Sequence, residues 1–324
     1  MKKPTERVLD TTFKKDVFEG LTATPKYLYS QYIYDKKGDK LFQDIMAMPE
    51  YYLTNCELEI FVEHTPAIAG IFDESEKGFD LIELGAGDGK KTKILLKYLS
   101  ENNFNFTYKP IDISQNAIDG LTETLKKELP NIKVFGETGE YFEVLERLKK
   151  INARKKVLLF LGSNIGNLLH EKAIDFLSKL CGTLHGDDVI FMGFDQKKHP
   201  QTILDAYNDA NGITEAFNKN LLHRINVEMG ANFPVNKFMH WQVYDPETGT
   251  AKSYLMAKEA VQVQIPAIQL QVHFKQWETI HTEISQKYDH EVVQWLARES
   301  GLKIETFFND SKGYYTDYIF KKER

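Results

Sequence analysis

The sequence predicts an α/β fold in which a largely parallel sheet is covered by helices, together with a second lobe of mixed α+β structure. Between Asp80 and Asp195, short apolar runs typical of buried strands alternate with helical patterns, and such alternation requires a parallel sheet with helices on both faces. The first of these runs breaks into three closely spaced glycines before a helical pattern begins. About ninety residues of different character then precede a strand-like tail, which is too many for a loop and predicts the second lobe.

Composition and charge exclude some classes of function. The 324 residues are 42% hydrophobic and 12% aromatic, enough for a large core divided between two lobes. The net charge of −6, the isoelectric point near 5.9 and the absence of a basic and aromatic cluster argue against nucleic acid as a partner. Cys56 and Cys181 provide neither a disulfide framework nor, with histidine, the spacing of a zinc site, so we expect no metal and a reducing cytoplasm.

The N-terminal segment and the hydropathy pattern bear on location. Residues 1–8 lack the apolar stretch of a secretion signal, and no run of about eighteen apolar residues occurs. We therefore expect a cytoplasmic protein without a membrane partner.

The first sixty residues have a helical pattern and are rich in tyrosine. A helical stripe over residues 41–46 ends before Pro49, because a residue that precedes proline is disfavoured in the helical region. A helix over Thr54–Ile71 then leads into the sheet. We expect one domain from residues 61–195 and 286–324, and a second, substrate-binding domain from residues 1–60 and 196–285.

The remaining elements follow from periodicity and turn signals. Strands are expected at 79–84, 107–112, 132–136, 156–161 and 188–194, and helices at Gln115–Glu128, Tyr141–Ile151 and Glu171–Leu180. The second lobe contributes strands near Met239–Tyr244, Ala251–Ala257 and Glu259–Ile265. The tail supplies a helix at Asp289–Ser300 and two strands, Leu302–Asn309 and Tyr314–Phe320, which complete a seven-strand sheet.

The glycine turn carries the strongest local signal. Glycine allows a sharp turn and lets a ligand lie against backbone amides beside a helix N-terminus. The spacing Glu83-x-Gly85-x-Gly87-x-Gly89 places the third glycine one residue too early for the dinucleotide motif, and the sequence does not complete a phosphate P-loop. It resembles the first motif of Rossmann-like methyltransferases that use S-adenosylmethionine, although a glycine-rich turn without this ligand is the alternative.

Two polar residues follow other strands of the predicted sheet. Asp112 ends the second strand, near the place where an acidic residue accepts hydrogen bonds from ribose hydroxyls in such folds; a solvated loop aspartate is the alternative. Asn167 follows the apolar run 157–161, where it could bind a zwitterionic substrate. The alternative for Asn167 is the N-cap of a helix over Leu168–Leu180.

Three polar residues alternate near the end of the second lobe. In an extended segment, His281, Glu283 and Ser285 project from one face. A carboxylate and a hydroxyl in this arrangement suit a heteroaromatic ring whose N–H groups need acceptors once they leave water. Surface exposure is the alternative for each.

Taken together, these motifs resemble those of the histidine Nα-methyltransferases that make hercynine, the first step to ergothioneine, and of their relatives that act on tryptophan-like amino acids. The resemblance covers nearly the whole chain. The matching segments are Tyr34–Phe42, Pro49–Tyr52, Glu83–Gly87 with Lys91 and Thr92, Phe160–Asn167, Ala216–Asn220 and His281–Ser285.

The resemblance implies a role for each matching residue. The cofactor S-adenosylmethionine is expected to contact Tyr34, Glu83, Gly85, Gly87, Lys91, Asp112, Glu140 and Tyr141. The substrate is expected to contact Tyr51, Gly162, Asn167, Tyr207, Ser253, Glu283 and Ser285, with Tyr34, Gly162 and Asn167 near its amine, Tyr51, Asn167 and Tyr207 at its carboxylate, and Glu283 and Ser285 at the imidazole. Tyr34 and Asn167 are the expected catalytic residues.

The sequence departs from the family pattern at two places. Glu140 stands where the family has aspartate at the adenine end, with Glu137 as the alternative. Ser253 stands where the histidine enzymes have methionine, which affects the side-chain pocket.

These observations predict a cytoplasmic, monomeric Nα-methyltransferase whose substrate is L-histidine and whose product is the trimethylated betaine. A carboxylate such as Glu283 favours imidazole over indole, which has a single N–H and gains little from a carboxylate that must be desolvated. A tryptophan derivative is the alternative substrate. Alternatives of a different class are a nicotinamide-dependent oxidoreductase and a non-catalytic protein that binds the cofactor.

Overall fold

The computed structural model describes residues 8–73, 77–87, 89–151 and 154–323. The chain forms two compact units. The four-strand unit comprises Met1–Tyr52 and Lys198–Ser285, and the seven-strand unit comprises Leu53–Lys197 and Gln286–Arg324. The first boundary therefore falls at 52/53, earlier than the expected 60/61. The N-terminal residues 1–7, which the expectation about a secretion signal concerned, lie outside the described residues.

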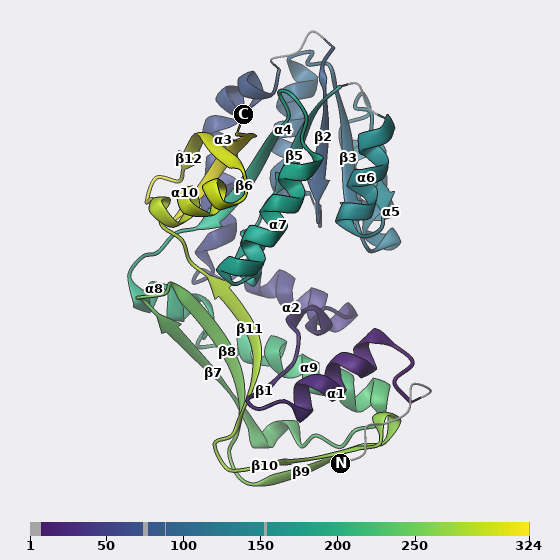
Figure 1. The fold of residues 1–324 in the computed structure, drawn as a ribbon, viewed down its shortest axis with the longest axis vertical. Coiled ribbons are helices and arrows are strands. Elements are labelled where there is room, and N and C mark those ends of the chain that lie inside the picture. Colours follow the sequence, from purple (N-terminus) through teal and green to yellow (C-terminus); the bar gives the residue numbers. More distant parts are fainter. Residues whose placement is uncertain (1–7, 74–76, 88, 152–153, 324) are drawn as a thin grey trace. The chain divides into compact units, whose positions relative to one another are not determined.

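The seven-strand unit alternates strands and helices along the chain, as the sequence predicts (Figure 1). Its elements are α3 (Tyr52–Phe72), β2 (Phe79–Leu84), α4 (Lys90–Glu101), β3 (Phe106–Asp112), α5 (Gln115–Glu128), β4 (Glu137–Thr138), α6 (Tyr141–Ile151), β5 (Lys155–Phe160), the 3-10 helix η2 (Asn164–Asn167), α7 (His170–Thr183), β6 (Val189–Asp195), α10 (His290–Glu299), β12 (Leu302–Asn309) and β13 (Tyr315–Lys322).

The sheet of this unit has the order β12-β13-β6-β5-β2-β3-β4. Strand β2 lies between parallel neighbours, with Leu81 opposite Tyr108 on one side and Val157 on the other. Strand β13 is antiparallel to both β12 and β6. The tail thus completes a seven-strand sheet, as predicted, and the carboxyl ends of β2, β3 and β5 lie at one edge, where α/β sheets bind ligands.

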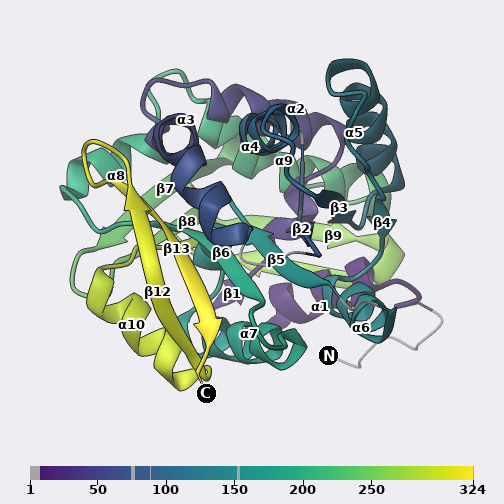
Figure 2. The same cartoon turned by 90° about the horizontal axis from the view of Figure 1, so that it is seen from above.

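Helices cover both faces of this sheet (Figure 2). On one face α3, α4 and α5 pack over a core that includes Phe61, Leu95 and Leu125. On the other face α6, α7 and α10 enclose a second core around Leu177 and Leu296. Every residue of β2, β5 and β6 is buried, which explains why these strands read as continuous apolar runs rather than alternating ones.

One predicted strand is wrong. The sequence predicts a strand at 132–136, but the edge strand β4 contains only Glu137 and Thr138. Within the earlier segment, Val134 forms an isolated bridge to Tyr108, and Phe135 is 58% exposed. An edge position lacks a second neighbour to pair with, so the apolar composition of this segment did not produce a regular strand.

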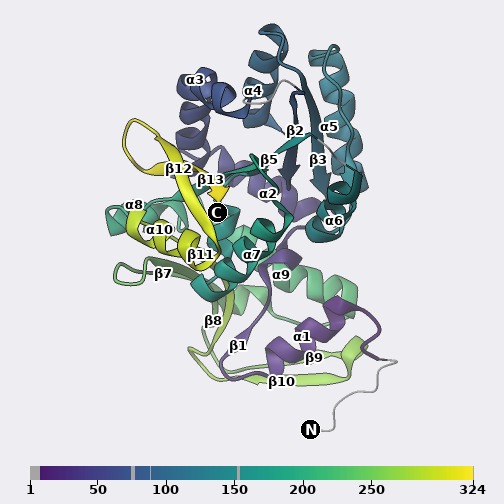
Figure 3. The same ribbon diagram turned by 45° about the horizontal axis from the view of Figure 1, so that its top comes forward.

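The four-strand unit combines a mixed sheet, a hairpin and helices (Figure 3). Its elements are α1 (Thr12–Thr22), β1 (Lys26–Tyr27), the 3-10 helix η1 (Ser30–Ile33), α2 (Lys36–Met46), α8 (Pro200–Ala206), α9 (Ile213–Met229), η3 (Val235–Lys237), β7 (Phe238–Asp245), β8 (Thr250–Ala257), β9 (Val261–Ile265), η4 (Pro266–Ile268), β10 (Leu270–Phe274) and β11 (Thr279–Gln286).

The main sheet of this unit has the order β1-β11-β8-β7, and β9 pairs with β10 separately. Strand β1 is parallel to β11, whereas β7 and β8 form an antiparallel pair. The three strands expected in this lobe are present as β7, β8 and β9 with shifted ends. Among the described residues, we find no helix with the length and apolar character needed to cross a membrane.

Candidate functional site

The glycine turn of the seven-strand unit adopts backbone conformations that side chains disfavour. Gly85, Gly87 and Gly89 have φ angles of +72°, +53° and +64°, and Gly89 is the N-cap of α4. A Cβ atom on Gly85 would lie 2.7 Å from the hydroxyl of Tyr141, whereas one on Gly87 would meet nothing within 4 Å. The turn therefore has open space at Gly87, beside the N-terminus of a helix.

Three further predicted residues lie together near this turn. Asp112 ends β3, and its Oδ1 accepts a hydrogen bond of 2.9 Å from the amide of Ser114. Desolvation, with contributions from the negative charges of Asp112 and Glu140, raises the pKa of Tyr141 to about 12. The structure thus brings Gly85, Asp112, Glu140 and Tyr141 into one region.

Glu137, the alternative to Glu140 at the adenine end, is paired with another side chain. A carboxylate oxygen of Glu137 lies 2.7 Å from the guanidinium of Arg147. Glu140 is exposed and directly precedes the first residue of α6. This arrangement favours Glu140 over Glu137 as the acidic group available to a ligand.

Substitution of Gly85 tests the role of the turn. Gly85→Ala should weaken binding of S-adenosylhomocysteine about tenfold, because the left-handed conformation costs a residue with a Cβ roughly 1–2 kcal/mol and the new methyl displaces Tyr141. Isothermal titration calorimetry measures the change. Gly120→Ala in α5 is the matched control: an added Cβ there meets nothing within 4 Å, so affinity should not change. Equal affinities for the Gly85 variant and the wild type would contradict the prediction.

Glu83 lies inside the unit rather than at the turn's surface. Its residue surface is 3% exposed, and its carboxylate accepts hydrogen bonds from the hydroxyls of Thr92, at 2.7 Å, and Tyr108. Desolvation raises the pKa of Glu83 to about 7, despite the opposing effect of these two hydrogen bonds. The arrangement indicates that Glu83 braces the start of α4 against β3 and does not present its carboxylate to a ligand.

Lys91 and Gly162 meet at a residue that the sequence analysis did not identify. The Lys91 ammonium pairs with the carboxylate of Glu57 on α3. The same carboxylate accepts the amide N–H of Gly162 at 2.9 and 3.0 Å from its two oxygens. Glu57 is one of three glutamates on α3, with Glu59 and Glu63, so no local signal in the sequence singles it out.

Asn167 is exposed and belongs to η2. The N-cap of α7 is Leu169, without a side-chain cap bond, so the alternative interpretation of Asn167 as a helix cap is wrong. The preceding backbone is unusual, because Ser163 has a φ of +55° and Gly166 packs against the backbone of Gln286. The loop thus leaves the Asn167 side chain outside the core.

In the four-strand unit, two motifs that are far apart in sequence hold Tyr34. Asp35 caps α2 through the amides of Lys37 and Gly38, at 3.0 and 2.7 Å, and also accepts the Asn220 side-chain amide at 2.8 Å. The ring of Tyr34 lies 5.4 Å from that of Phe217. These contacts fix the backbone on both sides of Tyr34 and one face of its ring.

Four other predicted substrate residues of this unit lie near Tyr34. The hydroxyl of Tyr207 and that of Ser285 are 2.7 Å apart, and the rings of Tyr207 and Tyr51 are 6.2 Å apart. Desolvation raises the pKa of Tyr34 well above its usual value, and the charge of Glu283 adds to the effect, with smaller contributions from both other tyrosines. The unit therefore gathers Tyr34, Tyr51, Tyr207, Glu283 and Ser285 into a single aromatic and acidic cluster.

Ser253 is turned toward a different partner. It is 1% exposed, and its hydroxyl donates to the Gln242 side-chain carbonyl at 2.7 Å. Its own carbonyl accepts from the hydroxyl of Thr282 at 3.1 Å. The structure places Ser253 in the sheet beside β7, with its hydroxyl already engaged.

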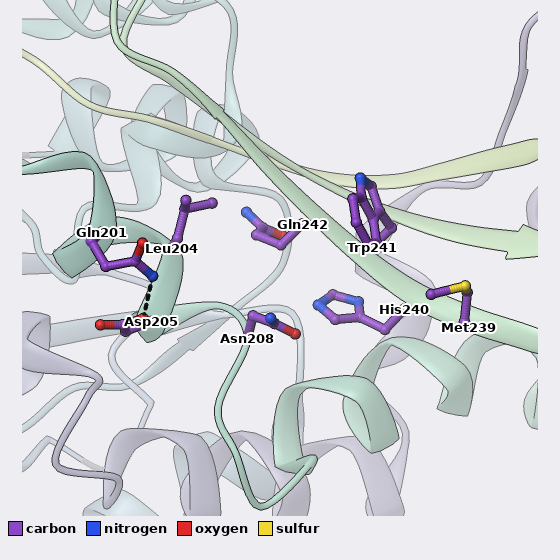
Figure 4. A pocket seen from close by; sticks show the side chains of 8 residues that line it. All are labelled: Gln201, Leu204, Asp205, Asn208, Met239, His240, Trp241 and Gln242. Carbon is purple, nitrogen blue, oxygen red and sulfur yellow. Dashed lines mark hydrogen bonds between the residues drawn. The ribbon is translucent and has the colours of Figure 1, made fainter.

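A pocket of about 320 Å³ lies between α8 and β7 (Figure 4). Its walls are Gln201, Leu204, Asp205, Asn208, Met239, His240, Trp241 and Gln242. None of the predicted substrate residues lines it. Nε2 of His240 lies 2.9 Å from the carbonyl oxygen of Tyr207 and donates to it, so this wall supports the backbone of a predicted substrate residue.

The described residues contain no group of three or more side chains that could hold a metal ion. The seven-strand unit instead has two features that suit a nucleoside. One is a glycine turn with open space beside a helix N-terminus, and the other is an acidic residue at the end of the next strand. Together with the sheet order and the antiparallel β13, these features define an S-adenosylmethionine-dependent methyltransferase.

Comparison with known families agrees with this class. Residues 13–322 match the family described as "Histidine-specific methyltransferase, SAM-dependent", and the chain belongs to this family. The nicotinamide-dependent oxidoreductase considered from the sequence is therefore set aside.

Named relatives include "Histidine N-alpha-methyltransferase" of Mycolicibacterium smegmatis, 33% identical over 93% of this chain and 92% of the relative. The protein of the same name from Mycobacterium tuberculosis is 30% identical over the same shares. "Ergothioneine biosynthesis protein 1" of Schizosaccharomyces pombe is 28% identical over 91% of this chain and 39% of its own length. Among solved structures, magnesium protoporphyrin IX methyltransferase from Synechocystis with bound SAH aligns over 90% of this chain and 95% of its own, with a TM-score of 0.43 and 12% identity.

Proposed function

We propose that the protein transfers methyl groups from S-adenosylmethionine to the α-amine of L-histidine and forms Nα,Nα,Nα-trimethylhistidine, the first step of ergothioneine synthesis. Family membership over residues 13–322, together with the cluster of Tyr34, Glu283 and Ser285, carries this proposal.

In the seven-strand unit, Gly85, Gly87 and Asp112 would hold the cofactor, with Glu140 and Tyr141 at its adenine end. The cofactor supplies an electrophilic methyl group on a sulfonium. No covalent bond to the protein would be required, because the free amine of the substrate would accept the methyl group directly, so the residues of this chain would mainly align the two reactants. Gly162 and Asn167, which follow β5, are proposed to bond the substrate amine and carboxylate.

In the four-strand unit, the carboxylate of Glu283 and the hydroxyl of Ser285 would accept the imidazole N–H groups. Tyr51 and Tyr207 would hold the substrate carboxylate through their hydroxyls. Because desolvation and the nearby Glu283 charge keep the pKa of Tyr34 high, Tyr34 stays protonated at neutral pH. We therefore assign Tyr34 a role as hydrogen-bond donor and as an aromatic face for the growing cation, rather than as a general base.

Each methyl transfer depends on the protonation state of the substrate amine. The amine must lose a proton before each attack, because a protonated amine has no lone pair. A positive charge beside the sulfonium would be repelled, which lowers the pKa of the bound amine and favours its free-base form. After three transfers the nitrogen carries no proton and a permanent positive charge.

One assay tests the substrate. Histidine, tryptophan and tyrosine are incubated separately with the enzyme and S-adenosylmethionine, and the products are followed by mass spectrometry. We expect addition of three methyl groups to histidine and much slower modification of the other two. Preferred methylation of tryptophan would replace histidine by an indole substrate, and binding of S-adenosylhomocysteine without transfer to any amino acid would indicate a non-catalytic protein.

We further propose that the enzyme acts as a monomer in the cytoplasm. Size-exclusion chromatography with light scattering at the assay concentration should give a mass near the 37.5 kDa of one chain. A dimer mass that persists on dilution would refute this.

A further inference from the structure

A polar cluster built around buried carboxyl groups in the seven-strand unit joins four of its elements. Glu57 on α3 is 0% exposed, yet its carboxylate contacts the Lys91 ammonium at the start of α4 and the Gly162 amide after β5. It also accepts the hydroxyl of Tyr315 on β13 at 3.0 Å. Figure 2 shows α3 and α4 on the same face of the sheet. Burial of an isolated carboxylate is strongly unfavourable, so these donors compensate the free-energy cost of burying Glu57.

A second carboxyl group completes the cluster. Asp317 on β13 is also 0% exposed, and within the described part of the chain no hydrogen-bond donor reaches either of its oxygens. Its neighbour is the Glu57 carboxylate, and desolvation together with that charge raises the pKa of Asp317 well above its usual value. A neutral Asp317 that donates its O–H to Glu57 satisfies both groups.

The charges of the cluster then balance. Desolvation is the largest single effect on Lys91 and lowers its pKa, but the charge and hydrogen bond of Glu57, with smaller contributions from Asp317 and Glu83, together raise that pKa above its usual value. One ammonium, one carboxylate and one carboxylic acid have no net charge. This balance keeps the free-energy cost of removing the two carboxyl groups from water low.

The neighbouring strand is shaped to admit this cluster. Gly193 lies in the middle of β6, where a Cβ atom would be 2.3 Å from the Tyr315 hydroxyl and 2.6 Å from a Glu57 oxygen. A glycine inside a buried strand weakens the strand and commonly marks a close approach of another group. Here it allows the carboxylate of α3 to reach the sheet.

We propose that Glu57 is a positioning residue for methyl transfer, which shares one proton with Asp317 and uses its single negative charge to fix Lys91 and Gly162 together. Lys91 lies in the first turn of α4, directly after the glycine turn, and Gly162 begins the loop that leads to Asn167. Glu57 thereby sets the position of the cofactor-binding turn relative to the loop assigned to the substrate amine. The second half of this inference rests on the proposed function, whereas the effect on the cofactor turn does not.

The first test is Glu57→Gln, which keeps the shape of the side chain and removes its charge. We expect S-adenosylhomocysteine to bind about tenfold more weakly and kcat to fall about 30-fold, because misplacement of reacting groups by about 1 Å can cost up to ~10²-fold. Affinity is measured by calorimetry, so this result is independent of which amino acid is methylated. Affinity and kcat both within twofold of the wild type would overturn the proposal.

Asp188→Asn is the matched control for a purely structural effect. Asp188 is another buried acid of this unit, 4% exposed and paired with Lys156 at 3.0 Å, and it precedes the first residue of β6, whereas the glycine turn follows the carboxyl end of β2. This variant should melt at a lower temperature while its S-adenosylhomocysteine affinity and kcat stay at wild-type values. Equal kinetic losses in the Asp188 and Glu57 variants would mean that Glu57 only supports the fold, and the proposal would fail.

A third variant keeps the proposal testable if Glu57→Gln does not fold. Asp317→Asn replaces a neutral acid by a neutral amide, so it should fold and lose less than about threefold in S-adenosylhomocysteine affinity, well below the effect of removing the Glu57 charge. The charged groups around Asp317 are Glu57 on α3 and Lys91 on α4, with Glu83 on β2 adjacent to both. Infrared difference spectra at pH 7 should contain a protonated-carboxyl band that Asp317→Asn removes and Asp188→Asn keeps. Absence of such a band in the wild type, or an affinity loss of tenfold or more in Asp317→Asn, would place the charge on Asp317 and overturn the proposal.

Discussion

Glu283→Ala should lower kcat/KM for histidine about 100-fold, because hydrogen bonds to a charged acceptor contribute roughly 1.5–3 kcal/mol. The substrate imidazole would lose its acceptor in the aromatic cluster of the four-strand unit. Tryptophan, whose ring has a single N–H, should lose much less, so the preference for histidine over tryptophan should shrink. Steady-state kinetics with both amino acids measure the two ratios.

The control for this prediction is Glu259→Ala. Glu259 pairs with Lys237 at the surface, 56% exposed, and exposed ion pairs contribute little. Kinetics of the control should match the wild type. S-adenosylhomocysteine should bind the Glu283 variant with affinity within about threefold of the wild type; losses of similar size in cofactor binding and in histidine turnover would count against the assignment of Glu283 to the imidazole.

Lys287→Met should lower the free energy of unfolding of the seven-strand unit by about 3–5 kcal/mol, because it removes the ammonium that pairs with the buried charge of Asp195. The ammonium and carboxylate are 2.6 Å apart, and both side chains are 0% exposed. The pair lies where the chain after β11 meets the end of β6, beside the hydrogen bond of 2.8 Å from the Tyr288 amide to the Asp195 carbonyl. Urea unfolding followed by far-ultraviolet circular dichroism measures the loss.

An exposed ion pair of the same unit provides the comparison. Lys97 and Glu101 on α4 are each 63% exposed, so Lys97→Met should change the free energy of unfolding by less than about 0.5 kcal/mol. Adding Asp195→Asn to the Lys287 variant should restore part of the lost stability, since the buried charge is then removed. A Lys287 variant as stable as the wild type would show that the buried pair makes no net contribution to the free energy of unfolding.

Several structural features were predictable from local sequence alone. The helices Gln115–Glu128 and Tyr141–Ile151 have the predicted ends, because polar residues and periodicity mark helix boundaries locally. The strand Leu302–Asn309 was likewise predicted, by the turn residues around it. The strand expected at 132–136 was wrong, because whether a short apolar run pairs depends on its neighbours in the sheet.

The candidate site was also predictable only in part from the sequence. Glycine spacing and the acid after β3 indicated the cofactor turn, since backbone conformation and strand order restrict which residues can occupy those positions. The N-cap alternative for Asn167 could not be decided from sequence, because the capping residue depends on where the helix begins.

The sequence by itself determined the α/β class, the glycine turn at Gly85 and the family motifs, because these depend on short-range patterns of residue type. Only the tertiary structure decided that Glu83 faces the interior, that Ser253 bonds Gln242, and that Glu57 meets Lys91, Gly162 and Asp317. These contacts join positions up to 260 residues apart along the chain (Glu57 to Asp317, 317 − 57). The charge and hydrogen bonding of a buried acid depend on which distant groups exclude water from it, and no local pattern in the sequence records that.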